Sequence, residues 1–363
     1  MKKPAKDGKH NATMKALVFH GPNRIALEDR PKPVIKQATD AIVRITTTSI
    51  CGTDLHILKG DVPAITDGRI LGHEGVGIIE EVGTNVSGFH KRDKVLISLI
   101  TSCGRCVFCK KAMYSHCLAG GWQLGNRIDG TQAEYVRIPF ADNGLYLLPS
   151  GSDDEAVLML SCILPTGLEC GVLNGRVKPG DIVAIVGAGP VGLAALLMAK
   201  LYSPAGIIMI DLDDNRLEVA RLFGATKVVN SSDGKAAERV MALTQAAGVD
   251  VAIEAVGLSA TFDICQAIIA PGGRIANVGV HGKPVELHLE RLWASNITLT
   301  TRLVDAGTTP MLLRMVQSGR LDAKKLVSHQ FKLSEIMKAY DTFANAAKEH
   351  ALKVVIQNAG ANG

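Results

Sequence analysis

Aromatic residues are scarce in this sequence, at 4% of its 363 positions, and its basic residues form no continuous stripe. Proteins that bind nucleic acid usually combine a basic face with aromatic side chains that stack on bases. The formal charge of +5 does not restore that hypothesis, because four lysines and one aspartate within residues 1–10 contribute a net +3 of it. The composition therefore argues against a nucleic-acid partner.

Long apolar runs are also nearly absent, and only residues 182–199 approach the length of a membrane span without a charge. Three glycines and Pro190 interrupt that run, where a spanning helix would leave backbone groups unpaired in lipid. Residues 1–13 have neither the apolar stretch nor the cleavage site of a signal peptide. We therefore expect a disordered tail over residues 1–13, no membrane segment and a cytoplasmic protein.

The motif GxGxxG occurs once, as Gly187, Gly189 and Gly192 with Pro190 and Val191 between them. Alone it is a weak signal, but here an apolar, β-branched run precedes it and a helix-like apolar run follows it. At such a strand-to-helix turn the first glycine permits the tight turn, the second lets the backbone approach a pyrophosphate, and the third allows close packing. The motif therefore predicts a dinucleotide site with the phosphates at a helix N-terminus.

The chain after the glycines alternates between strand and helix patterns. Strands are predicted at residues 206–210, 249–254, 274–278 and 297–301, and helices at 217–223, 234–246 and 259–270. In such a parallel sheet, ligands bind beyond the carboxyl ends of the strands, where Val256, Gly279 and Val280 would lie.

Asp211 directly follows the first of these strands, residues 206–210, and lies about 20 residues beyond the glycines. A carboxylate at this position can accept hydrogen bonds from the adenosine ribose and would repel the 2′-phosphate of NADP. The alternative is that Asp211 only caps the helix at 217–223, although Asp213 or Asp214 could do so equally. The position predicts NAD as the coenzyme.

A thiol, a hydroxyl, a carboxylate and an imidazole are gathered within residues 49–56, and a second polar cluster follows at residues 71–75. Cys51 and His73 suit zinc, which binds thiolate sulfur and imidazole nitrogen and, in catalytic sites, keeps a fourth position open. Taken singly, a histidine is an ordinary polar group and a cysteine a small buried side chain. Cys162, just before the first predicted parallel strand, is placed to reach the same ion, or is a buried structural thiol like Cys170.

Four further cysteines, Cys103, Cys106, Cys109 and Cys117, follow the spacing CxxCxxCx7C. Disulfides are a poor explanation, because nothing marks the protein as secreted. An iron–sulfur cluster is poorer still, because the bacterial ferredoxin run ends with a gap of three and a proline. The spacing predicts a closed structural zinc site that folds a lobe at about residues 100–120.

Together these elements resemble the zinc-dependent medium-chain alcohol dehydrogenase family from about residue 14 to residue 357. The resemblance implies an α/β fold in which a Rossmann domain, a doubly wound parallel sheet at residues 165–305, is inserted into a GroES-like, mostly β catalytic domain. That catalytic domain would comprise residues 14–164 and 306–363. In animal liver members an arginine follows the first zinc-ligand cysteine and contacts the pyrophosphate, whereas Gly52 stands here. That contact is therefore absent or supplied elsewhere.

The resemblance also implies roles for individual residues. The zinc ligands would be Cys51, His73 and Cys162, with Glu74 as a nearby or exchangeable ligand, and Asp54 would contact the far nitrogen of His73. Thr53 and His56 would be catalytic. Ile100 and Trp122 would line the substrate pocket, and Thr166 and Arg216 would belong to the coenzyme site. Zinc lowers the pKa of an oxygen acid bound to it to about 7, so a bound alcohol can lose its proton near neutral pH. Thr53 could then pass the proton on, and His56, an imidazole, could release it to solvent.

The sequence thus predicts an NAD-dependent alcohol dehydrogenase with two zinc ions per chain, forming a homodimer or homotetramer and acting on small primary or secondary alcohols or the matching carbonyl compounds. Two alternatives stay open. One is a polyol or amino-alcohol dehydrogenase of the same fold. The other is a catalytically silent NAD(P)-binding relative, although such members usually lack the zinc ligands.

Overall fold

The computed structural model describes residues 12–358. The predicted tail at residues 1–13 lies outside the described residues except for its last two positions, and Thr13 already begins the first strand. Within the described chain, no helix combines the length and apolar character needed to cross a membrane.

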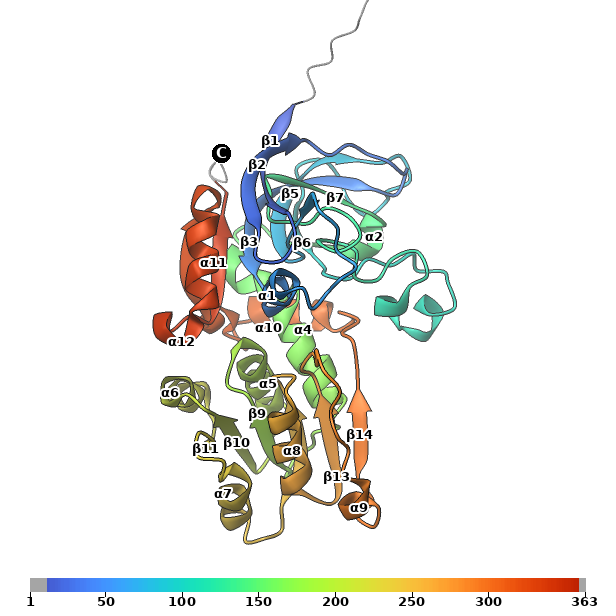
Figure 1. The fold of residues 1–363 in the computed structure, drawn as a ribbon. Coiled ribbons are helices and arrows are strands. Elements are labelled where there is room, and N and C mark those ends of the chain that lie inside the picture. The colour runs from blue at the N-terminus through green and yellow to red at the C-terminus, as the bar shows by residue number, and fades with distance from the viewer. Residues whose placement is uncertain (1–11, 359–363) are drawn as a thin grey trace, which may run out of the picture.

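The lower half of the molecule in Figure 1 is built on a six-stranded parallel sheet in the order β11-β10-β9-β12-β13-β14. Its strands are β9 (Ile182–Val186), β10 (Gly206–Asp211), β11 (Lys227–Asn230), β12 (Val249–Glu254), β13 (Ile269–Asn277) and β14 (Thr298–Thr301). The order reverses beside β9, which is the doubly wound arrangement predicted from the sequence. β11 was not predicted, because its four residues are too short to show a period.

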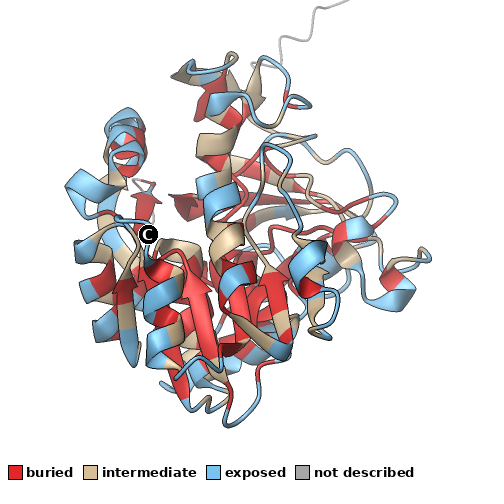
Figure 2. Ribbon diagram, turned by 60° about the horizontal axis from the view of Figure 1, so that its bottom comes forward, coloured by how far each residue is buried: buried red, intermediate tan, exposed pale blue. Residues whose placement is uncertain are grey.

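Successive residues of the central strands pack on opposite faces of this sheet. Val183 and Ile185 belong to one apolar cluster, whereas Ala184 and Val186 belong to another, and all four are buried. Figure 2 shows these strands as buried, with helices on both sides. Burial on both faces explains why the strand reads as a continuous apolar run rather than an alternating one.

The upper half of Figure 1 is mostly β. One sheet has three strands, β1 (Thr13–Phe19), β2 (Ile25–Pro31) and β4 (Arg69–Ile70). The other has seven: β3 (Ala41–Ile50), β5 (Gly75–Val82), β6 (Lys94–Ile97), β7 (Tyr135–Ile138), β8 (Leu145–Leu147), β15 (Val327–Lys332) and β16 (Lys353–Gln357). β16 pairs with β3, so both ends of the chain build this half, as predicted. The residue limits of the two domains stay a prediction.

The helices connect and cover these sheets. They are α1 (Gly52–Lys59), α2 (Ala141–Gly144), α3 (Asp154–Leu158), α4 (Ile163–Thr166), α5 (Pro190–Lys200), α6 (Asp214–Phe223), α7 (Ala236–Leu243), α8 (Ser259–Ile268), α9 (Leu289–Leu292), α10 (Thr309–Gln317), α11 (Ile336–Ala344) and α12 (Ala346–Glu349). A π-helical segment, Gly167–Leu173, extends α4.

Two segments differ from their sequence-based prediction. The sequence of residues 311–353 predicts a pair of helices that return the chain to the catalytic domain, but β15 lies between α10 and α11, and Lys353 begins β16. Successive residues of β15 alternate between half-buried and exposed, as in a strand. In the sequence this short alternation lies between two strong helical patterns and is easily missed. Pro31 and Pro33 predict a loop between the strand patterns at residues 14–19 and 41–47, but this stretch contains β2, whose charged residues masked its strand character.

Candidate active site and metal centres

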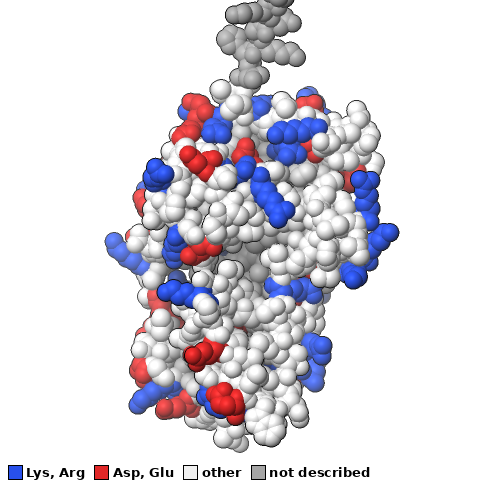
Figure 3. Space-filling view, turned by 45° about the vertical axis from the view of Figure 1, so that its right-hand side comes forward, with Lys and Arg blue, Asp and Glu red and all other residues white. Residues whose placement is uncertain are grey.

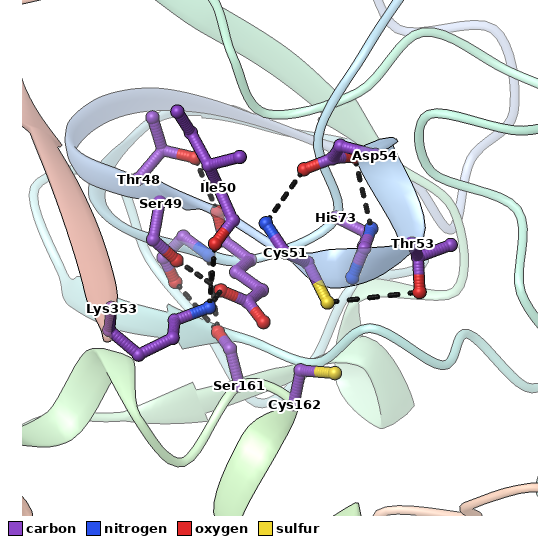
Figure 4. A network of polar contacts seen from close by, with 12 residues as sticks. Thr48, Ser49, Ile50, Cys51, Thr53, Asp54, His73, Ser161, Cys162 and Lys353 are labelled. Atoms are coloured by element: carbon purple, nitrogen blue, oxygen red, sulfur yellow. Dashed lines mark hydrogen bonds and ion pairs between the residues drawn. The ribbon is translucent and has the colours of Figure 1, made fainter. Parts of the chain in front are cut away.

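Three separate parts of the chain bring the first predicted ligand set together. Cys51 lies between the end of β3 and the start of α1, His73 and Glu74 lie between β4 and β5, and Cys162 immediately precedes α4. One ligand atom from each of the four residues lies within 4.8 Å of the other three. Figure 4 shows the sulfurs of Cys51 and Cys162 and the ring of His73 close to one another.

The chemistry of this cluster fits zinc. Zn–S bonds of about 2.3 Å in a tetrahedron place ligands about 3.8 Å apart, which these spacings allow. A hydrogen bond from the Cys162 thiol holds the pKa of Cys51 well below its ordinary value. Burial lowers the pKa of His73, but the negative charges of Cys51, Asp54 and Glu74 together outweigh it and raise that pKa to about 9. The cluster therefore attracts positive charge, which a metal ion would supply in place of a proton.

Glu74 has one oxygen committed to the protein and one without a partner. Its Oε2 accepts hydrogen bonds from Lys353 Nζ at 2.5 Å and from Ser49 Oγ. Its Oε1 is buried and has no hydrogen-bond partner among the described residues. A buried orphan oxygen is costly, and a cation within this ligand set would satisfy it. Lys353 itself is 1% exposed and also donates to the Ile50 carbonyl.

Asp54 lies near His73 and is also almost fully buried, and its predicted contact with the far nitrogen of His73 stays a prediction. Its Oδ1 is 3.9 Å from His73 Nδ1, too long for a hydrogen bond, while its Oδ2 accepts from the Cys51 N–H at 2.9 Å. Gln132 donates to the same oxygen and accepts from the hydroxyl of Tyr340. Burial raises the pKa of Asp54 to about 6. The chain Asp54–Gln132–Tyr340 thus fixes the carboxylate that faces the His73 ring.

Thr53 and His56 are three residues apart on α1 and line the same cavity as the ligands. Thr53 Oγ1 is 3.7 Å from Cys51 Sγ. His56 Nδ1 is 2.8 Å from Asp61 Oδ2, and its side chain is about one third exposed. The predicted order, with the hydroxyl next to the metal ligands and the imidazole toward solvent, matches this geometry. Nothing in the sequence distinguished Asp61 from other surface carboxylates.

This cavity has a volume of about 560 Å³ and lies between the two halves of the molecule, where Figure 3 shows a hollow. Ile100 and Trp122 line it, and the Trp122 ring lies edge-on to His73 with centroids 6.1 Å apart. Cys170 also lines it and is 2% exposed. The predicted coenzyme residues on its wall are Thr166, Pro190, Val191, Gly279 and Val280. Among the described residues, no carboxylate lines this cavity.

A second cavity, of about 790 Å³, lies over the carboxyl ends of β9, β10 and β12, and Gly189, Val256 and Arg216 line it. Gly187 has a φ of +105°, which favours glycine. A Cβ on Gly192 would lie 1.7 Å from the Gly187 carbonyl oxygen, so no side chain fits there. The roles predicted for the first and third glycines therefore match the geometry of the turn.

Asp211 lies in this second cavity. Its Oδ2 accepts from the Ala188 N–H at 2.6 Å and its Oδ1 from the Asp213 N–H at 3.0 Å. The alternative that Asp211 caps the following helix is wrong, because Asp213 is the residue that accepts hydrogen bonds from the first turn of α6.

Glu254 organises two loops of the cofactor region and was not recognised in the sequence. It is fully buried at the end of β12 and accepts hydrogen bonds from the N–H groups of Val256 and Gly257 and from Thr261 Oγ1. A Cβ on Gly279 would lie 2.3 Å from its Oε2, so the loop after β13 packs directly on this carboxylate. The sequence feature that could have identified Glu254 is a carboxylate at the end of an otherwise apolar strand.

The second predicted ligand set, Cys103, Cys106, Cys109 and Cys117, also converges, with its four sulfurs within 4.8 Å of one another. The N–H groups of Cys109 and Leu118 hold the pKa of Cys106 at about 6, which favours a thiolate. All eight cysteines are free thiols in the described chain. This set consists of four cysteine sulfurs and no other type of ligand, which fits a closed structural zinc site.

Comparison with known proteins agrees with this geometry. The family described as "Alcohol dehydrogenase GroES-like domain" matches residues 37–150, and that described as "Zinc-binding dehydrogenase" matches residues 190–318. A zinc-dependent alcohol dehydrogenase 2 of Streptococcus pneumoniae is similar in structure, with a TM-score of 0.92, 58% identity, and coverage of 96% of this chain and 100% of its own. An alcohol dehydrogenase from Thermus sp. has a TM-score of 0.88 and 34% identity, over 95% of this chain and 100% of its own.

Sequence comparison alone reaches the same family. An alcohol dehydrogenase of Cupriavidus necator is 40% identical over 371 aligned positions, which cover 95% of this chain and 99% of that protein. The chain therefore belongs to the zinc-dependent medium-chain alcohol dehydrogenases, oxidoreductases that act on alcohols with zinc and a nicotinamide coenzyme.

Proposed function

We propose that this chain is an NAD-dependent alcohol dehydrogenase that transfers hydride reversibly between NAD(H) and a small primary or secondary alcohol or its carbonyl product. The observation that carries the proposal is the shared cavity. Cys51, His73 and Cys162 line it together with Thr53 and with the loop at Gly279 that follows a parallel strand. Metal ligands, a hydroxyl and the coenzyme loops therefore face one enclosed space.

Bound zinc would polarise the substrate oxygen, and bound NAD would accept the hydride. Thr53 would accept a hydrogen bond from the alcohol hydroxyl and pass its proton outward. His56, held by Asp61 at the partly exposed end of the cavity, would exchange that proton with solvent. The apolar side chains of Ile100 and Trp122 would exclude water from the reacting carbon.

The choice of NAD over NADP is proposed from Asp211. Its two oxygens hold the backbone at Ala188 and Asp213, which fixes a negative charge in the second cavity. That charge can accept the ribose hydroxyls and would repel a 2′-phosphate. Arg216 lines the same cavity and would contact the ribose rather than neutralise a phosphate.

Two zinc ions per chain are proposed, one in each ligand set. The set with Cys51 opens on the substrate cavity and would be catalytic, with Glu74 as a nearby or exchangeable ligand. None of the four cysteines in the set with Cys106 lines that cavity, and this set would be structural.

We also propose that the chain forms a homodimer or homotetramer. β14 is the edge strand of the six-stranded sheet, so one side of it presents unpaired backbone groups. Exposed apolar side chains lie around that edge, at Leu289, Trp293, Leu299 and Leu303. A second copy pairing along this edge would cover both features, and light scattering of the pure protein would measure the assembly.

A panel of alcohols with NAD and NADP tests the activity. Small apolar alcohols should give the fastest NADH production, because the substrate cavity has no lining carboxylate to bind a polyol or an amino group. A clear preference for sorbitol-like or amino alcohols would favour the first alternative. No turnover by zinc-loaded protein that binds NADH would favour a silent relative.

A further inference from the structure

Asp305 connects the four-cysteine lobe to the segment between β14 and α10. Its Oδ1 accepts two hydrogen bonds from Ser115, from the N–H at 2.9 Å and from the hydroxyl at 2.7 Å. Ser115 belongs to the short 3₁₀ turn Tyr114–His116, between the third and fourth cysteines of the lobe. Both side chains are largely buried, and 190 positions separate them in the sequence.

The other oxygen of Asp305 binds a residue of the substrate-cavity wall. Its Oδ2 accepts from Arg302 Nη2 at 2.8 Å, and Arg302, Leu303 and Val304 all line the cavity that holds Cys51 and Cys162. One carboxylate therefore bonds to the lobe through one oxygen and to the cavity wall through the other.

The backbone of this segment is also held by Glu169, which is 2% exposed. Glu169 Oε2 accepts from the N–H groups of Asp305 and Ala306, and its Oε1 accepts from the N–H and hydroxyl of Thr308. Glu169 lies in the π-helical segment that follows Cys162 and α4. The wall segment is thus fixed between the element that carries Cys162 and the lobe.

The lobe also forms part of the cavity directly. His116 lines the cavity, and Tyr114 packs against the apolar cluster that contains Cys162 and Cys170. The turn that carries Ser115 therefore has a substrate-side face, and its position depends on the two cysteines that flank it.

We propose that Asp305 is a positioning residue through which the four-cysteine lobe sets the substrate wall at residues 301–304. A buried carboxylate that loses its donors must find others or move, so loss of the Ser115 contact would release Arg302 and the wall beside it. The kinetic part of this inference rests on the proposed alcohol dehydrogenase activity, whereas the structural part does not.

Hydrogen–deuterium exchange of the zinc-loaded full-length protein tests the structural part. Ser115→Ala removes only the hydroxyl contact, and Asp305→Asn keeps the shape but weakens the pair with Arg302. Both should speed exchange in residues 301–306, with zinc content unchanged. The matched control is Ser318→Ala, whose hydroxyl bonds only to the local Met315 carbonyl and is exposed. Unchanged exchange at 301–306 in both variants would overturn the proposal.

Kinetics then separate positioning from a general loss of stability. Both variants should raise the KM for the alcohol by about tenfold while kcat and the NADH dissociation constant stay near the parent values. Because the two residues act in one path, the double variant should be no worse than Asp305→Asn alone. Additive effects, or a kcat loss with an unchanged KM, would reject the path. A parent without turnover refutes the proposed function only, and the exchange result still decides the role of Asp305.

Discussion

Lys353 and Glu74 form a buried ion pair, with 2.5 Å between Nζ and Oε2, directly behind the ligand set of Cys51, His73 and Cys162. Burial lowers the pKa of Lys353, but the charge and hydrogen bond of Glu74, together with the charges of Cys51 and Cys162, outweigh it and the net shift is upward. The ammonium group therefore stays charged and holds one oxygen of Glu74, while the other oxygen has no hydrogen-bond partner among the described residues.

Replacing Lys353 should destabilise the protein strongly. Lys353→Met leaves the Glu74 carboxylate buried and unpaired, which costs about 3–5 kcal/mol in the free energy of unfolding. Lys324→Met is the matched control, because Lys324 pairs with Asp153 on the surface and such pairs contribute about 0–1 kcal/mol. Urea unfolding measures both. Equal losses of unfolding free energy in the two variants would show that breaking the buried pair costs no more than breaking the surface pair.

Cys106→Ser should affect metal content and stability more than the ligand set at Cys51. The proposed zinc ion, rather than an apolar core, would fold the lobe, so the variant should lose one of the two proposed ions and its melting temperature should fall. Metal analysis of the pure variant should give about one zinc per chain instead of about two. A variant that retains both ions would show that the lobe does not hold a structural zinc.

Cys162→Ala should abolish alcohol oxidation while NADH still binds, because the coenzyme cavity is built by other residues. Cys170→Ala is the matched control: this thiol lines the same cavity, and burial raises its pKa to about 12, so it stays protonated. NADH fluorescence titration and initial rates measure the two properties. An essential Cys170 with a dispensable Cys162 would mean that the wrong thiol was assigned.

His56→Gln should slow alcohol oxidation chiefly near and below neutral pH, where hydroxide is scarce and a relay base matters most. Zinc content should not change, because His56 lies outside the ligand set. The measurement is a pH–rate profile of the variant beside that of the parent. Superimposable profiles would remove His56 from the mechanism.

Asp211→Gly should relax the coenzyme preference from NAD toward NADP. Asp211→Asn separates the causes, because an amide of the same shape can still accept from Ala188 while it lacks the charge that repels the 2′-phosphate. The asparagine variant should therefore gain on NADP with a smaller loss on NAD. Steady-state kinetics with both coenzymes measure this, and a parent with higher kcat/KM for NADP would overturn the assignment.

The sequence by itself determined the features that depend on local spacing. Four cysteines within 15 positions can surround one ion without help from distant parts of the chain, and their sulfurs do lie together in the structure. The glycines at 187 and 192 likewise specify a turn whose geometry follows from a missing Cβ. The parallel strands were readable because burial on both faces makes them uniformly apolar.

Only the tertiary structure decided which distant residues support those sites. Antiparallel pairing of β16 with β3 places Val354 opposite Ile50, and this register brings Lys353 to Glu74 across 279 positions. The packing of the lobe on the segment after β14 similarly brings Ser115 to Asp305. A lone lysine or aspartate in a sequence carries no sign of its partner, because sheet register and the packing of separate segments are set by the whole core rather than by neighbours in the chain.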